Sequence, residues 1–240
     1  AFRLVIDGHD TTAILPLADM ANHSPHGTSF ERAFDASEEV FRVSYRGNRA
    51  LAKGEELLFR YSTMTNWQAL MYYGFALEHN PHDSIEISIP PPESDEDFQT
   101  EIKKQLFLTM YSDEFTSEHS LSWAADGETV HLSETALPSL RLFLLSAEEA
   151  DALHKDTVVQ RMQSMVSPRN ERRVLETLAN MFDAMLQTYP TTLEEDEELL
   201  RAPRRAELSE HQRSCLFYRI GQKRLLSKML AALDEQLELL

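Results

Sequence analysis

The chain has 240 residues, 42% of them apolar, which is enough to bury the core of one large domain or two smaller ones. It carries 40 acidic and 23 basic side chains, so its formal charge is -17. This charge argues against binding to nucleic acid or to an anionic membrane surface and favours a protein partner. No apolar run approaches the roughly 18 residues that span a bilayer. The single cysteine, Cys215, excludes an internal disulfide and makes a reducing environment the default, without identifying a compartment.

The first 90 residues have the short period of β-strands. Residues 40–46, VFRVSYR, alternate apolar and polar side chains, as a half-buried strand does. Residues 84–90, SIEISIP, repeat this alternation with isoleucines, and residues 51–62 predict a glycine turn that runs into another strand. Residues 65–75, TNWQALMYYGF, predict a short helix that ends at Gly74.

The stretch IPPPESDED, residues 89–97, interrupts this pattern. Three consecutive prolines can neither continue a strand ladder nor occupy the interior of a helix. We therefore predict a domain boundary here, with a β-rich domain over residues 1–90 and an all-α domain over residues 91–240. The expected fold class is α+β.

The second domain has the period of helices. The expected helices cover residues 96–111, 137–145, 146–165, 170–189 and 224–240. The last contains one apolar stripe at spacings of three and four, formed by Leu226, Met229, Leu233, Leu237 and Leu240, which indicates a buried face. The acidic run TTLEEDEELL, residues 191–200, is typical of a solvated helix N-terminus.

A polar loop, DMANHSPHGTS, follows an apolar run at residues 19–29. It has three possible interpretations: a turn capped by Asn22 and Ser24, a metal site at His23 and His26, or a binding loop for a small polar cofactor. The two histidines have no matching second pair of ligands, which disfavours zinc. Ser24 lacks the glycine-flanked strand-to-helix elbow of a nucleophilic serine.

Three motifs in order narrow these alternatives. LPLADMANHS at 15–24, LAKGEELLFRYS at 51–62 and TNWQALMYYGF at 65–75 together resemble the second half of a SET domain of the Rubisco large-subunit methyltransferase type. The stretches at 191–200 and 215–226, CLFYRIGQKRLL, resemble the C-terminal substrate-binding domain of that family. The resemblance covers nearly the whole chain.

The resemblance implies a cofactor, S-adenosylmethionine, held against the Asn-His-Ser loop. Asn22 and the backbone of His23 match the family's cofactor-binding positions, and Tyr61 matches its catalytic tyrosine. An in-line methyl transfer needs positioning more than acid-base chemistry, and weak carbon-hydrogen to oxygen contacts can hold a polarised methyl group. No metal is expected.

The resemblance also implies a site for the methyl acceptor. Asp19 matches the position where the family's backbone carbonyl faces the target nitrogen, and Tyr73 and Phe75 match the wall of its acceptor channel. A lysine must be neutral to attack, and an apolar channel favours the uncharged amine. The two aromatic residues could otherwise belong to an ordinary core.

The resemblance implies an S-adenosylmethionine-dependent protein-lysine N-methyltransferase that acts as a monomer on a protein substrate. The family's SET domain begins upstream with a Gly-x-Gly segment, and only fourteen residues precede the motif LPLADMANHS here, so we expect a fragment that lacks the N-terminal part of that domain. The alternative is a non-catalytic protein-interaction module that uses the helical domain. The sequence does not identify the substrate, the choice between lysine and histidine, the degree of methylation or the compartment.

Overall fold

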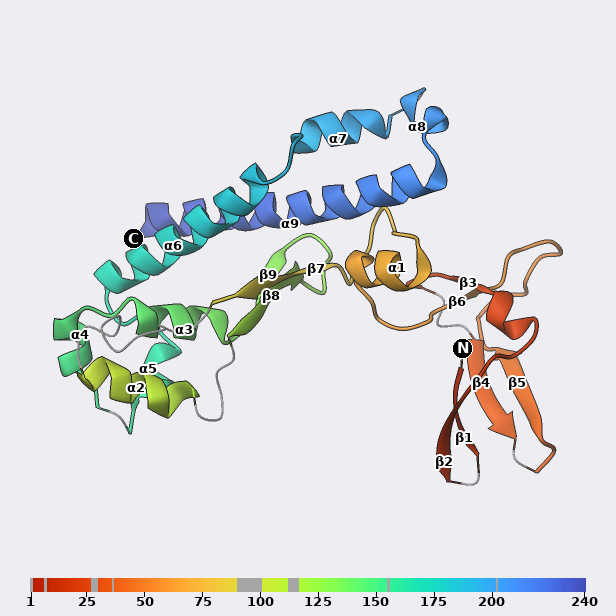
Figure 1. Cartoon of the computed structure of the whole chain (residues 1–240), viewed down its shortest axis with the longest axis horizontal. Coiled ribbons are helices and arrows are strands. Elements are labelled where there is room, and N and C mark those ends of the chain that lie inside the picture. The colour runs from red at the N-terminus through yellow and green to blue at the C-terminus, as the bar shows by residue number, and fades with distance from the viewer. Residues whose placement is uncertain are drawn as a thin grey trace. The chain divides into compact units, whose positions relative to one another are not determined.

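The structure, a computed structural model, describes residues 2–6, 8–26, 30–35, 37–89, 101–111, 117–154, 156–201 and 203–240 (Figure 1). Its contacts divide the chain into two compact units, Ala1–Met64 (unit 1) and Thr65–Leu240 (unit 2). The boundary expected at residues 89–97 falls almost wholly outside the described residues. The division into domains 1–90 and 91–240 therefore stays a prediction, although unit 2 already begins at Thr65.

Unit 1 consists of three small two-stranded sheets. In chain order its elements are β1 (Phe2–Ile6), β2 (His9–Ala13), the 3-10 turn η1 (Ala18–Met20), β3 (Asn22–His23), β4 (Phe30–Asp35), β5 (Val40–Tyr45) and β6 (Leu58–Phe59). The pairs β1–β2 and β4–β5 are antiparallel hairpins, whereas β3 and β6 pair in parallel. The strand predicted at 40–46 is confirmed as β5, but Val43 on its expected inner face is 38% exposed.

Unit 1 buries few apolar side chains among its described residues. Phe59 and Met64 are buried, and the ring of Phe30 packs on those of Tyr45 and Phe59 at centroid distances of 5.2 and 5.0 Å. Several large apolar side chains remain exposed instead: Val5, Ile14, Leu17, Met20, Val40, Val43 and Leu57. Since burial of apolar surface provides most of the stability of a fold, the described residues of unit 1 contribute less to the stability of the chain than those of unit 2.

Unit 2 contains one three-stranded antiparallel sheet and the long helices. Its elements are α1 (Asn66–Tyr73), β7 (Ser84–Ser88), α2 (Glu101–Tyr111), β8 (Glu118–Trp123), β9 (Val130–Leu132), α3 (Ala136–Phe143), α4 (Ala147–Asp151), α5 (Val158–Met162), α6 (Pro168–Gln187), α7 (Leu193–Leu199), α8 (Arg204–Glu207) and α9 (Glu210–Leu239). The strand order is β7-β8-β9. The α+β class is confirmed, but the stretch expected to be wholly helical contains β8 and β9.

The core of unit 2 lies between this sheet, α6 and α9, which run side by side (Figure 1). The isoleucines of β7 point into it, as their alternation predicts. Of the predicted stripe on α9, Leu226, Met229 and Leu233 are buried, whereas Leu240 lies beyond the helix and is 37% exposed. The helix predicted at 65–75 is confirmed as α1, with a capping box at Thr65 and Gly74 at φ 79° as its C-cap.

The acidic run at 191–200 contains the N-cap and all of α7, but its side chains are not all solvated. Thr192 and Glu195 form a capping box at the start of this helix. Asp196, however, is completely buried, and it accepts hydrogen bonds from Arg219 Nε at 2.7 Å and Lys223 Nζ at 2.6 Å, both in α9. The two stretches that resemble the family's C-terminal domain, 191–200 and 215–226, therefore meet through a buried ion cluster.

Candidate functional site

The polar loop crosses the second motif of unit 1 as a short parallel strand pair. Asn22 and His23 of β3 lie opposite Leu58 and Phe59 of β6, and the backbone N–H of Ser24 donates to the carbonyl of Phe59 at 3.0 Å. Parallel strands need a long connection between them, and here the β4–β5 hairpin supplies it. Two segments more than thirty residues apart in sequence are thus brought together.

Tyr61 is the residue most firmly attached to this crossing. Its hydroxyl donates to the carbonyl of Ala21 at 2.6 Å, and its backbone N–H donates to Nδ1 of His23 at 3.1 Å. The rings of His23 and Tyr61 lie 5.2 Å apart. Because Nδ1 accepts this hydrogen bond, His23 orients the backbone of Tyr61 through its ring nitrogen. The structure therefore brings the predicted residues His23 and Tyr61 together.

Asn22 is exposed at the edge of the crossing. Its Nδ2 donates to Oε1 of Glu56 at 2.5 Å, so the amide is oriented by the second acid of the Gly-Glu-Glu motif. Neither Glu56 nor the carbonyl of Ala21 could be singled out from the sequence alone. Their contacts form only where β3 and β6 cross. In the sequence, Glu56 is recognisable only as the second acid of the Gly-Glu-Glu motif.

The Gly-Glu-Glu turn is itself braced. Gly54 has φ 89°, a backbone conformation that favours glycine. Glu55 forms a two-pronged ion pair with the guanidinium of Arg49 and accepts the N–H of Ala52 at 3.0 Å. The hydrogen bond from Arg49 is the main reason why the pKa of Glu55 falls to about 2. Glu55 thus stays ionised at neutral pH and fixes the turn next to Glu56.

Asp19 lies in η1, which follows a strained turn. Leu17 has φ 69° and ψ -48°, and the N–H of Ala18 donates to the carbonyl of Pro16 at 2.9 Å. These values define a γ-turn of the positive-φ form, which is rare and costly for a residue with a side chain. Strain of this kind clusters at binding and catalytic sites.

The turn interpretation applies to part of the same loop. The hydroxyl oxygen of Ser24 accepts the backbone N–H of His26 at 3.2 Å, so Ser24 caps a local turn. Asn22 instead points its amide to Glu56. Within the described residues no group of three or more His, Cys, Asp or Glu side chains could hold a metal ion. That His23 and His26 bind no metal stays a prediction.

Tyr73 and Phe75 belong to unit 2 and flank Gly74 at the end of α1. Their ring centroids are 6.0 Å apart, and Tyr73 is 54% exposed while Phe75 is half-buried. Trp67, Met71 and Tyr72 on the same helix are also exposed. Tyr73 therefore does not lie in the core of unit 2, and the interpretation of its ring as ordinary aromatic core is wrong.

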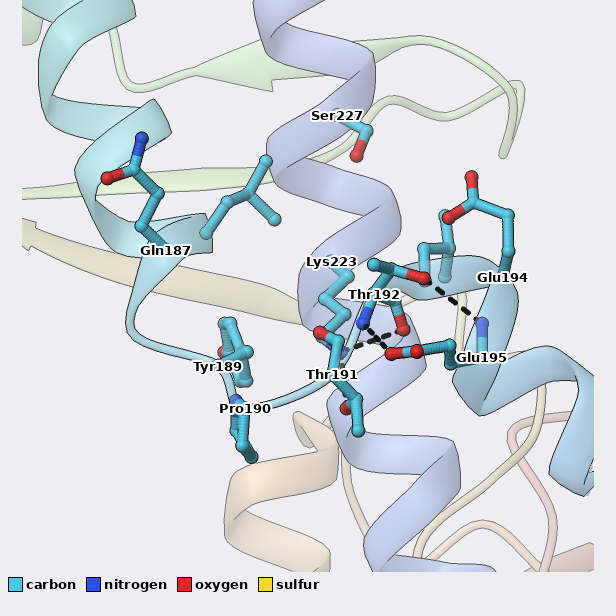
Figure 2. Close-up of a pocket in the computed structure, with 11 residues that line it drawn as sticks. Gln187, Tyr189, Pro190, Thr191, Thr192, Glu194, Glu195, Lys223 and Ser227 are labelled. Atoms are coloured by element: carbon cyan, nitrogen blue, oxygen red, sulfur yellow. Dashed lines mark hydrogen bonds between the residues drawn. The ribbon is translucent and has the colours of Figure 1, made fainter.

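Unit 2 also contains a cavity of about 420 Å³ at the loop between α6 and α7. Figure 2 shows Lys223 of α9 reaching this loop, where Nζ donates to the carbonyls of Thr191 and Thr192 at 2.6 and 3.1 Å. Lys223 also meets Asp196 and lies 5.1 Å from the ring centroid of Tyr189. All donors of this lysine are used within the protein. The cation therefore holds the loop in place and is not displayed to a ligand.

The chain is similar to one known protein family and to several known proteins. The family model for the Rubisco LSMT substrate-binding domain matches residues 95–226, more than half of the chain. The chain therefore belongs to the Rubisco LSMT substrate-binding family. Among the described parts of the structure, no helix is both long and apolar enough to cross a membrane.

Relatives and solved structures extend the match across the chain. Actin-histidine N-methyltransferases from Homo sapiens and Papio anubis are each 27% identical over 228 residues, which are 91% of this chain and 36% of the relative. The SET domain of LSMT bound to lysine and AdoHcy matches with a TM-score of 0.75 at 21% identity, over 99% of this chain and 53% of that one. Rubisco LSMT bound to AdoMet gives 0.73 at 22%, over 94% and 50%. The fold is thus that of about half of each of these solved chains, and the chain spans about a third of the length of the curated relatives.

Proposed function

We propose that the chain forms part of an S-adenosylmethionine-dependent protein-lysine N-methyltransferase. The observation that carries this proposal is the attachment of Tyr61 to the polar loop, through its hydroxyl to the carbonyl of Ala21 and through its N–H to His23. The expected catalytic tyrosine and the expected cofactor loop meet at hydrogen-bond distance although forty residues separate them. Membership of the Rubisco LSMT substrate-binding family supports the same reading.

The residues at the crossing fit the cofactor chemically. S-adenosylmethionine, when bound, supplies a methyl group on a sulfonium sulfur. The exposed amide of Asn22 can donate to a carboxylate and accept from an ammonium group, and its rotamer is set by Glu56. The backbone of His23 would anchor the cofactor beside it. Rubisco LSMT has been solved with AdoMet bound, which agrees with this assignment.

Tyr61 would act on the methyl group through its oxygen. Because its proton is directed to the carbonyl of Ala21, the hydroxyl oxygen would act toward the methyl group as an acceptor of weak contacts from polarised C–H groups. The carbonyl of Ala21 lies 2.6 Å from the same hydroxyl and offers a second oxygen. Two adjacent oxygens held by the backbone would position a methyl group without reorganising during the transfer.

The acceptor would be a neutral nitrogen of a protein substrate. Tyr73 and Phe75 would form an aromatic wall that favours the uncharged amine by desolvation. By the resemblance, the backbone carbonyl of Asp19 would accept a hydrogen bond from the acceptor nitrogen. We further propose that the protein acts as a monomer. Its charge of -17 suits a neutral or basic protein substrate and disfavours nucleic acid. The division into a SET part over 1–90 and a substrate-binding part over 91–240 belongs to this proposal.

Histidine is the second candidate for the acceptor, because curated relatives are named actin-histidine N-methyltransferases. The experiment that separates the two supplies S-adenosylmethionine with a labelled methyl group and two peptides that differ only by lysine or histidine. We expect transfer to the lysine peptide and loss of transfer in Tyr61→Phe. Transfer to the histidine peptide alone would replace lysine as the target. Failure of the protein to bind the cofactor, with partner binding retained, would support the non-catalytic interaction module instead.

A further inference from the structure

A cluster of buried polar side chains lies at the start of α1 and in the segment before β7, on either side of Tyr73 and Phe75 in the sequence. Asn66, the first residue of α1, and Asp83, which precedes β7, are each only 1% exposed, and Asn80 is 7% exposed. Polar groups are costly to bury unless they are hydrogen-bonded. The contacts of this cluster therefore indicate what it is for.

The amide of Asn66 uses its full hydrogen-bonding capacity. Nδ2 donates to the carbonyl of Leu77 at 2.9 Å and to Oδ2 of Asp83 at 3.3 Å. Oδ1 accepts the N–H of Leu77 at 2.9 Å and Nδ2 of Asn80 at 3.3 Å. Leu77 is thus bound through both of its backbone groups, which closes residues 66–77 into a ring. Tyr73 and Phe75 belong to this closed segment of the chain.

Asp83 holds the other side of Asn66. Its Oδ1 accepts the backbone N–H of Asn66 at 2.9 Å and that of Ser84 at 3.2 Å. Asn66 opens α1, so the carboxylate also lies where the helix dipole favours negative charge. Burial raises the pKa of Asp83 to about 6, so the group is still mainly ionised at neutral pH. The carboxylate therefore fixes the start of α1 while Asn66 fixes the backbone beyond its end.

Helix α9 seats the carboxylate. Gly221 lies in the interior of this 30-residue helix, where glycine is intrinsically disfavoured. A Cβ atom at Gly221 would lie 2.7 Å from Oδ2 of Asp83, so the absence of a side chain allows the carboxylate to rest on the helix. The next residue, Gln222, donates from Nε2 to the carbonyl of Ser84 at 3.2 Å. Two successive residues of α9 thus shape the surroundings of Asp83.

We propose that Asn66 and Asp83 are positioning residues, which hold the backbone of Tyr73 and Phe75 through Leu77 and are themselves seated on α9 at Gly221. The inference rests on the proposed function for the role of the aromatic pair as the wall of the acceptor channel. It gives α9, most of whose residues belong to the family-matched region, a second task beside core packing. It also explains why a buried amide, a buried acid and a helical glycine occur together.

Hydrogen exchange on the protein, followed by mass spectrometry, tests this directly. Asn66→Ala is compared with Asn170→Ala, because Asn170 is also buried and its Nδ2 also donates to a backbone carbonyl, that of Arg141 at 3.1 Å. We expect exchange over residues 73–78 to rise about tenfold or more in Asn66→Ala and to stay as in wild type in Asn170→Ala, since local opening follows the bonds lost. Equal exchange over 73–78 in the two variants would overturn the proposal.

Gly221→Ala provides a variant that should remain folded, since alanine favours helix formation. The added methyl group must displace Asp83, so exchange over 73–78 should rise in this variant while α9 stays protected. Unchanged exchange there would show that α9 does not seat the carboxylate. In a methyl-transfer assay, Asn66→Ala and Gly221→Ala should each raise KM for the acceptor peptide and leave cofactor affinity as in wild type. If wild type transfers no methyl group, the proposed function fails, and the exchange results still decide whether Asn66 and Asp83 position the aromatic segment.

Discussion

The buried ion cluster around Asp196 predicts a large effect of a single substitution on stability. Asp196 is fully buried, Lys223 is 1% exposed, and Arg219 is partly exposed. In Asp196→Ala the ammonium of Lys223 loses its carboxylate while it remains out of water. Removal of one partner of a buried pair costs about 3–5 kcal/mol, because the remaining charge is uncompensated.

The adjacent residue gives a matched control. Glu197 also pairs with an arginine of α9, Arg224 at 2.7 Å, but the two side chains are 32% and 34% exposed. Pairs at the surface are worth under about 1 kcal/mol, so Glu197→Ala should have a small effect. Urea unfolding followed by helical circular dichroism measures both variants. The reasoning would be refuted if the two losses were equal.

The same pair predicts a direction with pH. Although burial acts to raise the pKa of Asp196, the hydrogen bonds from Arg219 and Lys223 hold it below its usual value. A lowered pKa in the folded state gives stability that is present at neutral pH and is lost as pH falls through the folded value. Wild type should therefore lose more stability on acidification than Asp196→Asn, and parallel profiles would contradict the assignment.

Three further outcomes are expected. Because burial raises the pKa of Asp83 from 3.8 to about 6, the folded state favours the protonated acid. This stabilisation of about 3 kcal/mol should be lost as the pH rises from about 4 to about 6.5 in wild type but not in Asp83→Asn. Calorimetry at several pH values measures both proteins, and matching profiles would exclude this role of Asp83. Tyr61→Phe should reduce turnover far more than cofactor affinity, which steady-state kinetics and titration separate. Limited proteolysis should cleave first at residues 90–93, and initial cleavage inside either half would contradict the two-domain division.

Part of this fold could be predicted because the signals are local. The helix at 65–75 has a capping threonine and a terminal glycine, and the isoleucines of 84–90 alternate, so both elements follow from neighbouring residues. The strands β8 and β9 were missed because EHSLSW and VHL are short and carry few apolar residues. The pairing of β8 with β7 and of β9 with β8 stabilises them, and a single stretch of sequence does not reveal such pairing.

The site divides in the same way. His23 and Tyr61 could be named from motifs, and the structure brings them together. The burial of Asp196 could not be anticipated, since a run of five acids is usually solvated and its two cationic partners lie more than twenty residues away. Asn66 likewise read as a helix start, whereas its full set of bonds depends on residues 11 to 17 positions further on.

Titration of S-adenosylmethionine into the protein and its Asn22→Ala and Ser24→Ala variants, with a melting curve for each, tests the central claim most directly. Asn22 is exposed and caps no turn, so Asn22→Ala should weaken cofactor binding by about 1.5–3 kcal/mol, as expected for a lost hydrogen bond to a charged group, with stability nearly unchanged. Ser24 accepts the N–H of His26, so Ser24→Ala should cost about 1 kcal/mol of stability at unchanged affinity. Chelators should alter neither result. Normal cofactor binding by an Asn22→Ala protein that melts earlier, or a loss of binding on chelation, would contradict the account.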